Sequence, residues 1–151
     1  MRGLLTALLV LGFSAYGWSR GDEDVQKAAK EEGKKLEGTW QVTEAELAGM
    51  KLPEQVVKHI QLVLNGDRYV VTTAENKDQG TVHFLPDKSP KAMDIVGVEG
   101  PNKGKTFLAI YELDENTLKI CYDLKGQERP TEFKTKPKTQ LFLAIYHKQK
   151  P

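Results

Sequence analysis

The sequence predicts an all-β fold: an eight-stranded antiparallel up-and-down barrel with a short N-terminal helix. After Gly38, short runs rich in Val, Ile, Thr, Tyr and Phe recur about every ten residues, with turn-forming residues between them, which is typical of strands. No long helical pattern separates these runs, so neighbouring strands are expected to pair in sequence order. Closing such a meander into a barrel removes both unpaired edges, and we therefore expect a closed sheet.

Turn residues mark the joins between the predicted strands. Asn-Gly-Asp at 65–67 is a strong hairpin signal and Asp-Glu-Asn at 114–116 a second one, because these residues adopt the backbone conformations of tight turns. Residues 48–51 are expected to turn the chain after the first strand, and residues 53–57 to form a helical turn that begins at a proline. The predicted strands cover residues 39–47, 59–64, 68–73, 80–85, 92–98, 106–113, 117–122 and 140–147.

Side chains alternate between the two faces of a strand, which predicts the residues that fill the barrel. The most apolar series are expected to point inward, and they are Trp40 and Val42; Ile60, Leu62 and Leu64; Val82 and Phe84; Leu118, Ile120 and Tyr122; Leu141, Leu143 and Ile145. The strands at 106–113 and 140–147 are apolar on both faces, so their remaining large side chains should point outward and need a cover, either the N-terminal helix or a second copy of the protein. We call these side chains the outer apolar strip, which comprises Phe107, Tyr111, Phe142 and Tyr146.

Residues 1–17 are predicted to be a signal peptide. Arg2 supplies a positive start, an apolar run from Leu4 to Phe13 follows, and cleavage after Gly17 would place small residues at the −3 and −1 positions. The apolar run is too short to span a bilayer, so no membrane insertion is expected after cleavage, and a retained anchor is the alternative. The segment thus predicts an exported protein, periplasmic or extracellular.

Residues 18–35 form a polar lead-in to the barrel domain, which is expected to occupy residues 36–151. Val25, Ala28, Ala29 and Leu36 recur at roughly helical spacing, so a short helix lying against the barrel is expected. Bulky residues are scarce here and charge is dense, which makes a disordered linker the alternative.

The composition limits the classes of function. With 39% hydrophobic and 28% charged residues, the 151-residue chain fits one globular domain with a short appendage. Once Arg2 is removed with the predicted signal peptide, basic and acidic side chains are equal in number. This balance argues against nucleic-acid binding, because that binding depends on neutralising phosphates. Cys121 is the only cysteine, so it is expected to be a packed side chain and not a redox-active thiol.

Several motifs resemble those of known barrels. Gly38-Thr39-Trp40 after a helical lead-in resembles the Gly-x-Trp signature of lipocalins. More closely, residues 36–148 resemble an uncharacterised family of exported lipocalin-like bacterial proteins, expanded in planctomycetes. The matching pieces are Leu36-x-Gly38-Thr39-Trp40, Gly66-Asp67-x-Tyr69, Asp94-Ile95, residues 99–105, residues 110–113, Leu118-x-Ile120-Cys121 and Arg129-Pro130-x-x-Phe133.

The resemblance implies a lipocalin-like barrel and no known reaction. In lipocalins the tryptophan closes one end of the barrel beneath a basic side chain. Gly38, Trp40 and Arg129 are the implied closing residues, with the guanidinium of Arg129 stacked on the face of Trp40.

Three other patterns are weak signals of a site. Residues 100–106 are one residue short of a phosphate-binding loop and lead into a strand, so a glycine-rich hairpin loop is expected. His59, His83 and His147 lack metal-ligand spacing, so neither a metal nor a cofactor is expected. Residues 134–150 hold five lysines and no acid, and this stretch is expected to be a solvated rim and not an anion-binding surface.

No catalytic constellation is visible, so an enzyme is the third choice. The carboxylates at 112, 114, 115 and 132 could act as acid and base only if the fold brought them together. We expect a non-enzymatic exported binding module that holds a small hydrophobic or amphipathic molecule inside the barrel, at the end opposite Trp40. The predicted ligand contacts are Tyr69, Ile95, Leu108, Ile110 and Tyr122. The alternative is a structural or protein-interaction barrel with a filled core, which binds a protein partner or forms a homodimer through the outer apolar strip.

Overall fold

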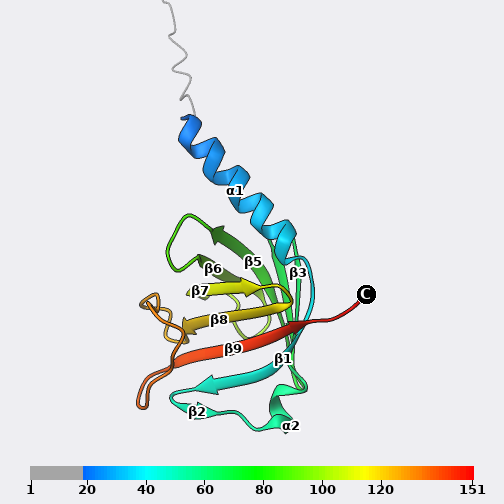
Figure 1. Ribbon diagram of the computed structural model, residues 1–151. Helices are drawn as coiled ribbons and strands as arrows, with labels where there is room; N and C mark the ends of the chain where they lie inside the picture. The colour runs from blue at the N-terminus through cyan, green and yellow to red at the C-terminus, as the bar shows by residue number, and fades with distance from the viewer. Residues whose placement is uncertain (1–18) are drawn as a thin grey trace, which may run out of the picture.

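Antiparallel pairing between neighbours in sequence, and one pairing between the first and last strands, define the architecture. The computed structural model describes residues 19–151 and is shown in Figure 1. Its helices are α1 (Arg20–Leu36) and α2 (Glu54–Val57). Its strands are β1 (Gly38–Leu47), β2 (Met50–Lys51), β3 (Gln61–Asn65), β4 (Arg68–Thr72), β5 (Lys77–Leu85), β6 (Ala92–Glu99), β7 (Thr106–Asp114), β8 (Thr117–Asp123) and β9 (Leu141–Lys148).

Strand β1 closes the barrel because it pairs on one side with β3 and on the other with β9. The β1–β9 register runs from Trp40 opposite Lys148 to Leu47 opposite Phe142, with an irregularity between Val42 and Glu44. Each strand from β3 to β9 is antiparallel to the next, so the eight long strands form a closed, lipocalin-like up-and-down barrel. The predicted fold class is therefore confirmed. The short β2, within the segment predicted as a turn, pairs only with the end of β1.

Helix α1 extends the lead-in away from the barrel and touches the core only with its C-terminal half, from about Ala29 onward. Glu32, Gly33 and Leu36 are its buried residues, and Figure 1 shows the helix standing off one end of the barrel. The segment is thus a helix and not the disordered linker. The expectation that it lies against the barrel holds only for this last part, because the preceding turns carry no large apolar stripe. The predicted signal peptide, residues 1–17, lies outside the described residues.

An ion pair between a buried carboxylate and a partly exposed lysine joins α1 to the barrel. The carboxylate of Glu32, only 3% exposed as a residue, accepts a hydrogen bond of 2.8 Å from Nζ of Lys91. Burial alone would raise the pKa of Glu32, but the hydrogen bond and charge of Lys91 outweigh it, so the pKa lies below its usual value. Burial and the nearby Glu32 carboxylate also raise the pKa of Tyr111, whose hydroxyl has no hydrogen-bond partner among the described residues.

Trp40 closes the end of the barrel to which α1 is joined. Its side chain is fully buried, and Nε1 donates a hydrogen bond of 2.9 Å to the carbonyl oxygen of Leu36, the last residue of α1. Nζ of Lys148 lies 5.3 Å from the centroid of the Trp40 ring. Gly38 has a φ of 138°, and a Cβ there would come within 2.7 Å of Cε of Lys148. The first glycine of the Gly-x-Trp motif is therefore needed for its backbone angle, whereas the flexible end of Lys148 could move aside.

The prediction that Arg129 stacks on Trp40 was wrong. Arg129 lies on the outer face of the barrel, where its guanidinium donates to the carbonyl oxygens of Met93 and Ala109 and to the carboxylate of Asp94. Lys148, at the end of β9, takes the place over Trp40 because β9 pairs directly with β1 at that level.

The predicted facing of β7 and β9 was also wrong. Tyr146 pairs with both Val42 and Leu118, and Tyr111 pairs with Ile120, so these tyrosines share the inner face of their partners. The outer apolar strip therefore points into the barrel. Conversely, the residues of β9 that were expected inside lie on the outer face and are half-buried, and they are Leu141, Leu143 and Ile145.

Replacing Trp40 with alanine is expected to lower the free energy of unfolding by about 3 to 5 kcal/mol, because a large buried aromatic is lost and a cavity remains. Urea denaturation followed by circular dichroism measures the change. Met50→Ala is the control, since Met50 is 71% exposed, and it should shift the value by less than about 0.5 kcal/mol. A Trp40→Ala protein as stable as the parent would show that closure does not depend on this side chain.

Candidate functional site

The candidate site is a cavity of about 270 Å³ inside the barrel. Its wall comes from the inner faces of β3 to β9, and its rim comes from the β4–β5 and β6–β7 loops, at the end away from Trp40. Exposed residues, Asn76 and Pro101, belong to this rim, so the cavity reaches the surface there. The lining residues are Leu62, Leu64, Tyr69, Val71, Thr73, Asn76, Asp78, Val82, Met93, Ile95, Pro101, Asn102, Phe107, Ile120, Tyr122 and Tyr146.

Three of the five residues predicted to contact a ligand line this cavity. Tyr69, Ile95 and Tyr122 are among its walls, whereas Leu108 and Ile110 are not. Ile110 pairs with Cys121, and Leu108 pairs with Asp94, which place both on the outer face of β7. The alternation on β7 is thus shifted by one residue from the prediction, and Phe107 takes the inward place.

The outward residues of β7 are nevertheless covered, because the segment between β8 and β9, residues 124–140, folds across them. Arg129 anchors this segment, with 2.8 Å from Nη1 to the carbonyl oxygen of Ala109 and 2.6 Å from Nη2 to Oδ1 of Asp94. Beneath it Ile110 is 1% exposed, and Cys121 is fully buried. Burial raises the pKa of Cys121 to about 11, which fits a packed thiol and not a reactive one.

One carboxylate, Asp78 on β5, lies in the wall of the cavity. It is 8% exposed and accepts three hydrogen bonds: 3.0 Å from the Tyr69 hydroxyl, 3.1 Å from the backbone N–H of Asn102 and 3.0 Å from Nδ2 of Asn102. All three donors are neutral. Among residues 19–151, no Lys, Arg or His side chain lies within ion-pair distance of Asp78.

Glycines let the partners of Asp78 approach it. A Cβ on Gly80 would stand 2.9 Å from the Tyr69 ring and 1.9 Å from the carbonyl oxygen of Val96, so only glycine lets this ring lie against β5. A Cβ on Gly97 would stand 2.0 Å from the carbonyl oxygen of Asn102. The β6–β7 loop therefore folds back over Gly97 and brings Asn102 to the carboxylate.

The phenols of the cavity remain protonated at neutral pH. Burial, together with the hydrogen bond to Asp78 and its charge, raises the pKa of Tyr69 well above its usual value. Burial and the charge of Asp78 raise the pKa of Tyr122 to about 12. The ring centroids of Phe107 and Tyr122 are 5.3 Å apart, and the ring centroids of Tyr122 and Phe142 are 5.5 Å apart. The cavity thus combines one carboxylate with an aromatic, otherwise mostly apolar wall.

Asp78 and Asn102 were missed as site residues. Strand β5 begins at Lys77, three residues before the predicted start, so Asp78 fell in the connection between two predicted strands. Continuing the inward alternation from Phe84 and Val82 through Gly80 reaches Asp78, and this was the available signal. Asn102 lies in the loop that resembles a phosphate-binding motif, and that loop indeed runs into a strand and not a helix.

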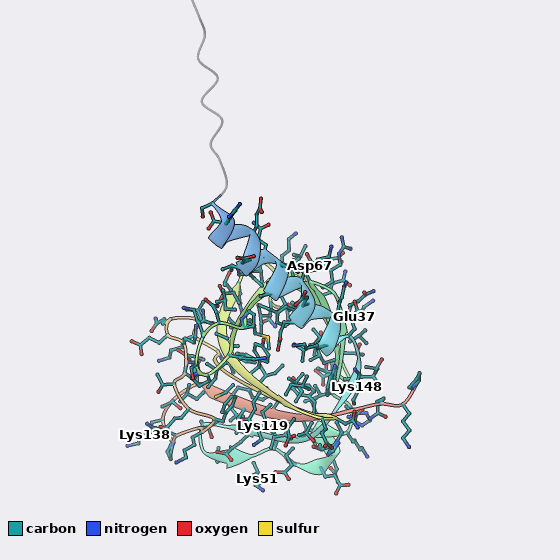
Figure 2. All side chains as sticks on the ribbon, turned by 45° about the horizontal axis from the view of Figure 1, so that its top comes forward. Glu37, Lys51, Asp67, Lys119, Lys138 and Lys148 are labelled. Atoms are coloured by element: carbon teal, nitrogen blue, oxygen red, sulfur yellow. The ribbon has the colours of Figure 1, made fainter. Side chains whose placement is uncertain are left out.

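Charged side chains gather elsewhere without forming a comparable site. Figure 2 places Asp67 and Glu37 near α1, and Lys51 and Lys138 on the opposite side of the molecule. A polar hollow of about 500 Å³ lies within the 124–140 segment, where Glu132 is 3.9 Å from Lys134 and 3.8 Å from Lys136. In the part of the chain that the structure describes, no three His, Cys, Asp or Glu residues are grouped so as to hold a metal ion.

None of the helices within residues 19–151 has the length and apolar character needed to cross a membrane. Comparisons of the chain with protein-family models, with curated proteins and with solved structures found no match.

Proposed function

We propose that this protein is an exported, non-enzymatic binding module that holds a small hydrophobic or amphipathic molecule in the open half of its barrel. The observation that carries the proposal is the internal cavity at the end opposite Trp40, with Tyr69, Ile95 and Tyr122 in its wall. Ligand pockets are typically concave and mostly apolar, with a few placed polar groups. The cavity has this character, since Asp78 and Asn102 are set among aromatic and aliphatic side chains.

The size of the cavity limits the ligand. Its volume of about 270 Å³ lies just below the usual range for ligand pockets, which begins at about 300 Å³. At about 30 Å³ per water molecule, the space corresponds to about nine waters. We therefore propose a ligand of about ten non-hydrogen atoms, in place of a long-chain lipid.

Binding is favoured over the alternatives for two reasons. The surface suggested for a protein partner or a homodimer, the outer apolar strip, faces the barrel interior. Among the described residues, Asp78 is the only carboxylate in the cavity wall, so no pair of carboxylates is available there for acid–base chemistry.

We also propose membership of the exported lipocalin-like bacterial family. Support comes from the closed barrel and from the Gly38-x-Trp40 motif. In this motif Gly38 adopts a positive φ, and Lys148 lies over the ring of Trp40.

Filling the cavity is expected to abolish binding. Val71 lines the cavity and Val70, its neighbour on β4, faces outward, so Val71→Trp and Val70→Trp form a matched pair. We expect calorimetric binding of at least one of 2-phenylethanol, 2-phenylethylamine and 1-octanol to the parent and to Val70→Trp, and at least about tenfold weaker binding to Val71→Trp. Equal binding by both variants would place the site elsewhere, and no binding to the parent would contradict the proposal.

Export predicts a mature chain that starts near Trp18. N-terminal sequencing of the protein recovered from the producing cell identifies the first residue. An intact Met1 on protein from the soluble cytoplasmic fraction would contradict the proposed localisation.

A further inference from the structure

We propose that the ligand is a small arylalkyl or alkyl amine whose protonated nitrogen pairs with Asp78. This inference rests on the proposed binding function and names the ligand class. The charge balance of the cavity favours this class. A buried carboxylate is stable when it is paired or fully hydrogen-bonded, and Asp78 has neutral donors only.

The carboxylate retains a free acceptor position. Its Oδ2 accepts from the Tyr69 hydroxyl and from Nδ2 of Asn102, at 3.0 Å each, whereas Oδ1 accepts only the Asn102 backbone N–H, at 3.1 Å. Each oxygen of a carboxylate can accept about two hydrogen bonds. One acceptor position on Oδ1 is therefore unused by the described residues, and the proposed ammonium would fill it. The existing bonds also hold the carboxylate in place, so a ligand would meet a pre-organised group.

Among residues 19–151, no other group around the cavity supplies the missing positive charge. The remaining titratable side chains in its wall are Tyr69 on β4, Tyr122 on β8 and Tyr146 on β9, and burial raises the pKa of each. Lys77, the neighbour of Asp78 on β5, is exposed and faces the other side of the strand. An anionic ligand would thus meet a carboxylate with no cation beside it, which disfavours fatty acids and phosphates.

The aromatic wall suits the same ligand class. The phenol ring of Tyr122 lies between Phe107 and Phe142, at centroid distances of 5.3 and 5.5 Å, and Asp78 is close enough for its charge to raise the pKa of Tyr122. Aromatic faces attract an ammonium group by cation–π interaction, and they pack against an apolar or aromatic body. A molecule of about ten non-hydrogen atoms can occupy the apolar depth with its body and reach Asp78 with its nitrogen.

Three probes that share one apolar body separate the charge from the rest of the ligand. 2-Phenylethylamine is cationic at pH 7, 2-phenylethanol is neutral and 3-phenylpropionate is anionic. Calorimetry on the purified protein is expected to give an affinity for the amine at least about tenfold higher than for the alcohol, because the ammonium adds an ion pair to the hydrogen bond with Asp78 and the alcohol brings no charge. The propionate should bind more weakly than the alcohol.

Substitutions assign the preference to Asp78. In Asp78→Asn the amine and the alcohol should bind within about threefold of each other, since the carboxylate charge is gone. Asp67→Asn removes an exposed carboxylate near α1 and should retain the full preference. Tyr69→Phe removes one donor from Asp78 but keeps the charge, so the preference for the amine should persist.

The outcomes are distinct. If neither these three probes nor 1-octanol binds the parent protein, the proposed binding function fails. If 1-octanol alone binds, the binding function holds and the amine inference is overturned. If the alcohol or the propionate binds as tightly as the amine, the cavity binds ligands but the amine inference is overturned. If Asp78→Asn does not fold, the ratio of amine to alcohol affinity in the parent and in Tyr69→Phe decides, and a ratio near one in either protein overturns the inference.

Discussion

The pairing of β1 with β9 is the constraint on which the rest of this structure depends. It converts a meander with two open edges into a barrel with none, and it also fixes the register that brings Lys148 over Trp40. Because that end is filled by Trp40 and joined to the last turn of α1, the interior space lies toward the other end. Closure and the position of the cavity therefore have one structural origin.

Close backbone approach then shapes the polar part of the cavity. Gly80 lets the ring of Tyr69 lie on β5, and Gly97 lets the β6–β7 loop turn back over β6. These two approaches bring a phenol and an asparagine to Asp78 from different sides. The resulting carboxylate is held by neutral groups, which is the basis of the inferred preference for a cation.

The sequence predicted the eight long strands and the burial of Trp40 because period-two alternation and turn residues are local signals. It did not predict which face of β7 and β9 is inward. Both faces of these strands are apolar, so the alternation of apolar and polar residues does not distinguish them. The inward face is set by the pairs Val42–Tyr146 and Tyr111–Ile120 across neighbouring strands. The same limit explains the placement of Leu108 and Ile110 in the predicted site. Lys148 takes the role predicted for Arg129 because a long-range register, and not a local motif, determines which cation reaches Trp40. Asp78 was missed because it lies between two predicted strands, where an aspartate two residues before a glycine is typical of a turn as well as of a strand.

A crystal structure of the protein with 2-phenylethylamine tests the central claim most directly, namely that the barrel holds a cavity whose charged contact is Asp78. The account predicts density for the amine inside the barrel, with its nitrogen within hydrogen-bond distance of Oδ1 of Asp78 and its ring against Phe107 and Tyr122. An interior filled by collapsed side chains, or an amine bound only on the outer surface, would contradict it.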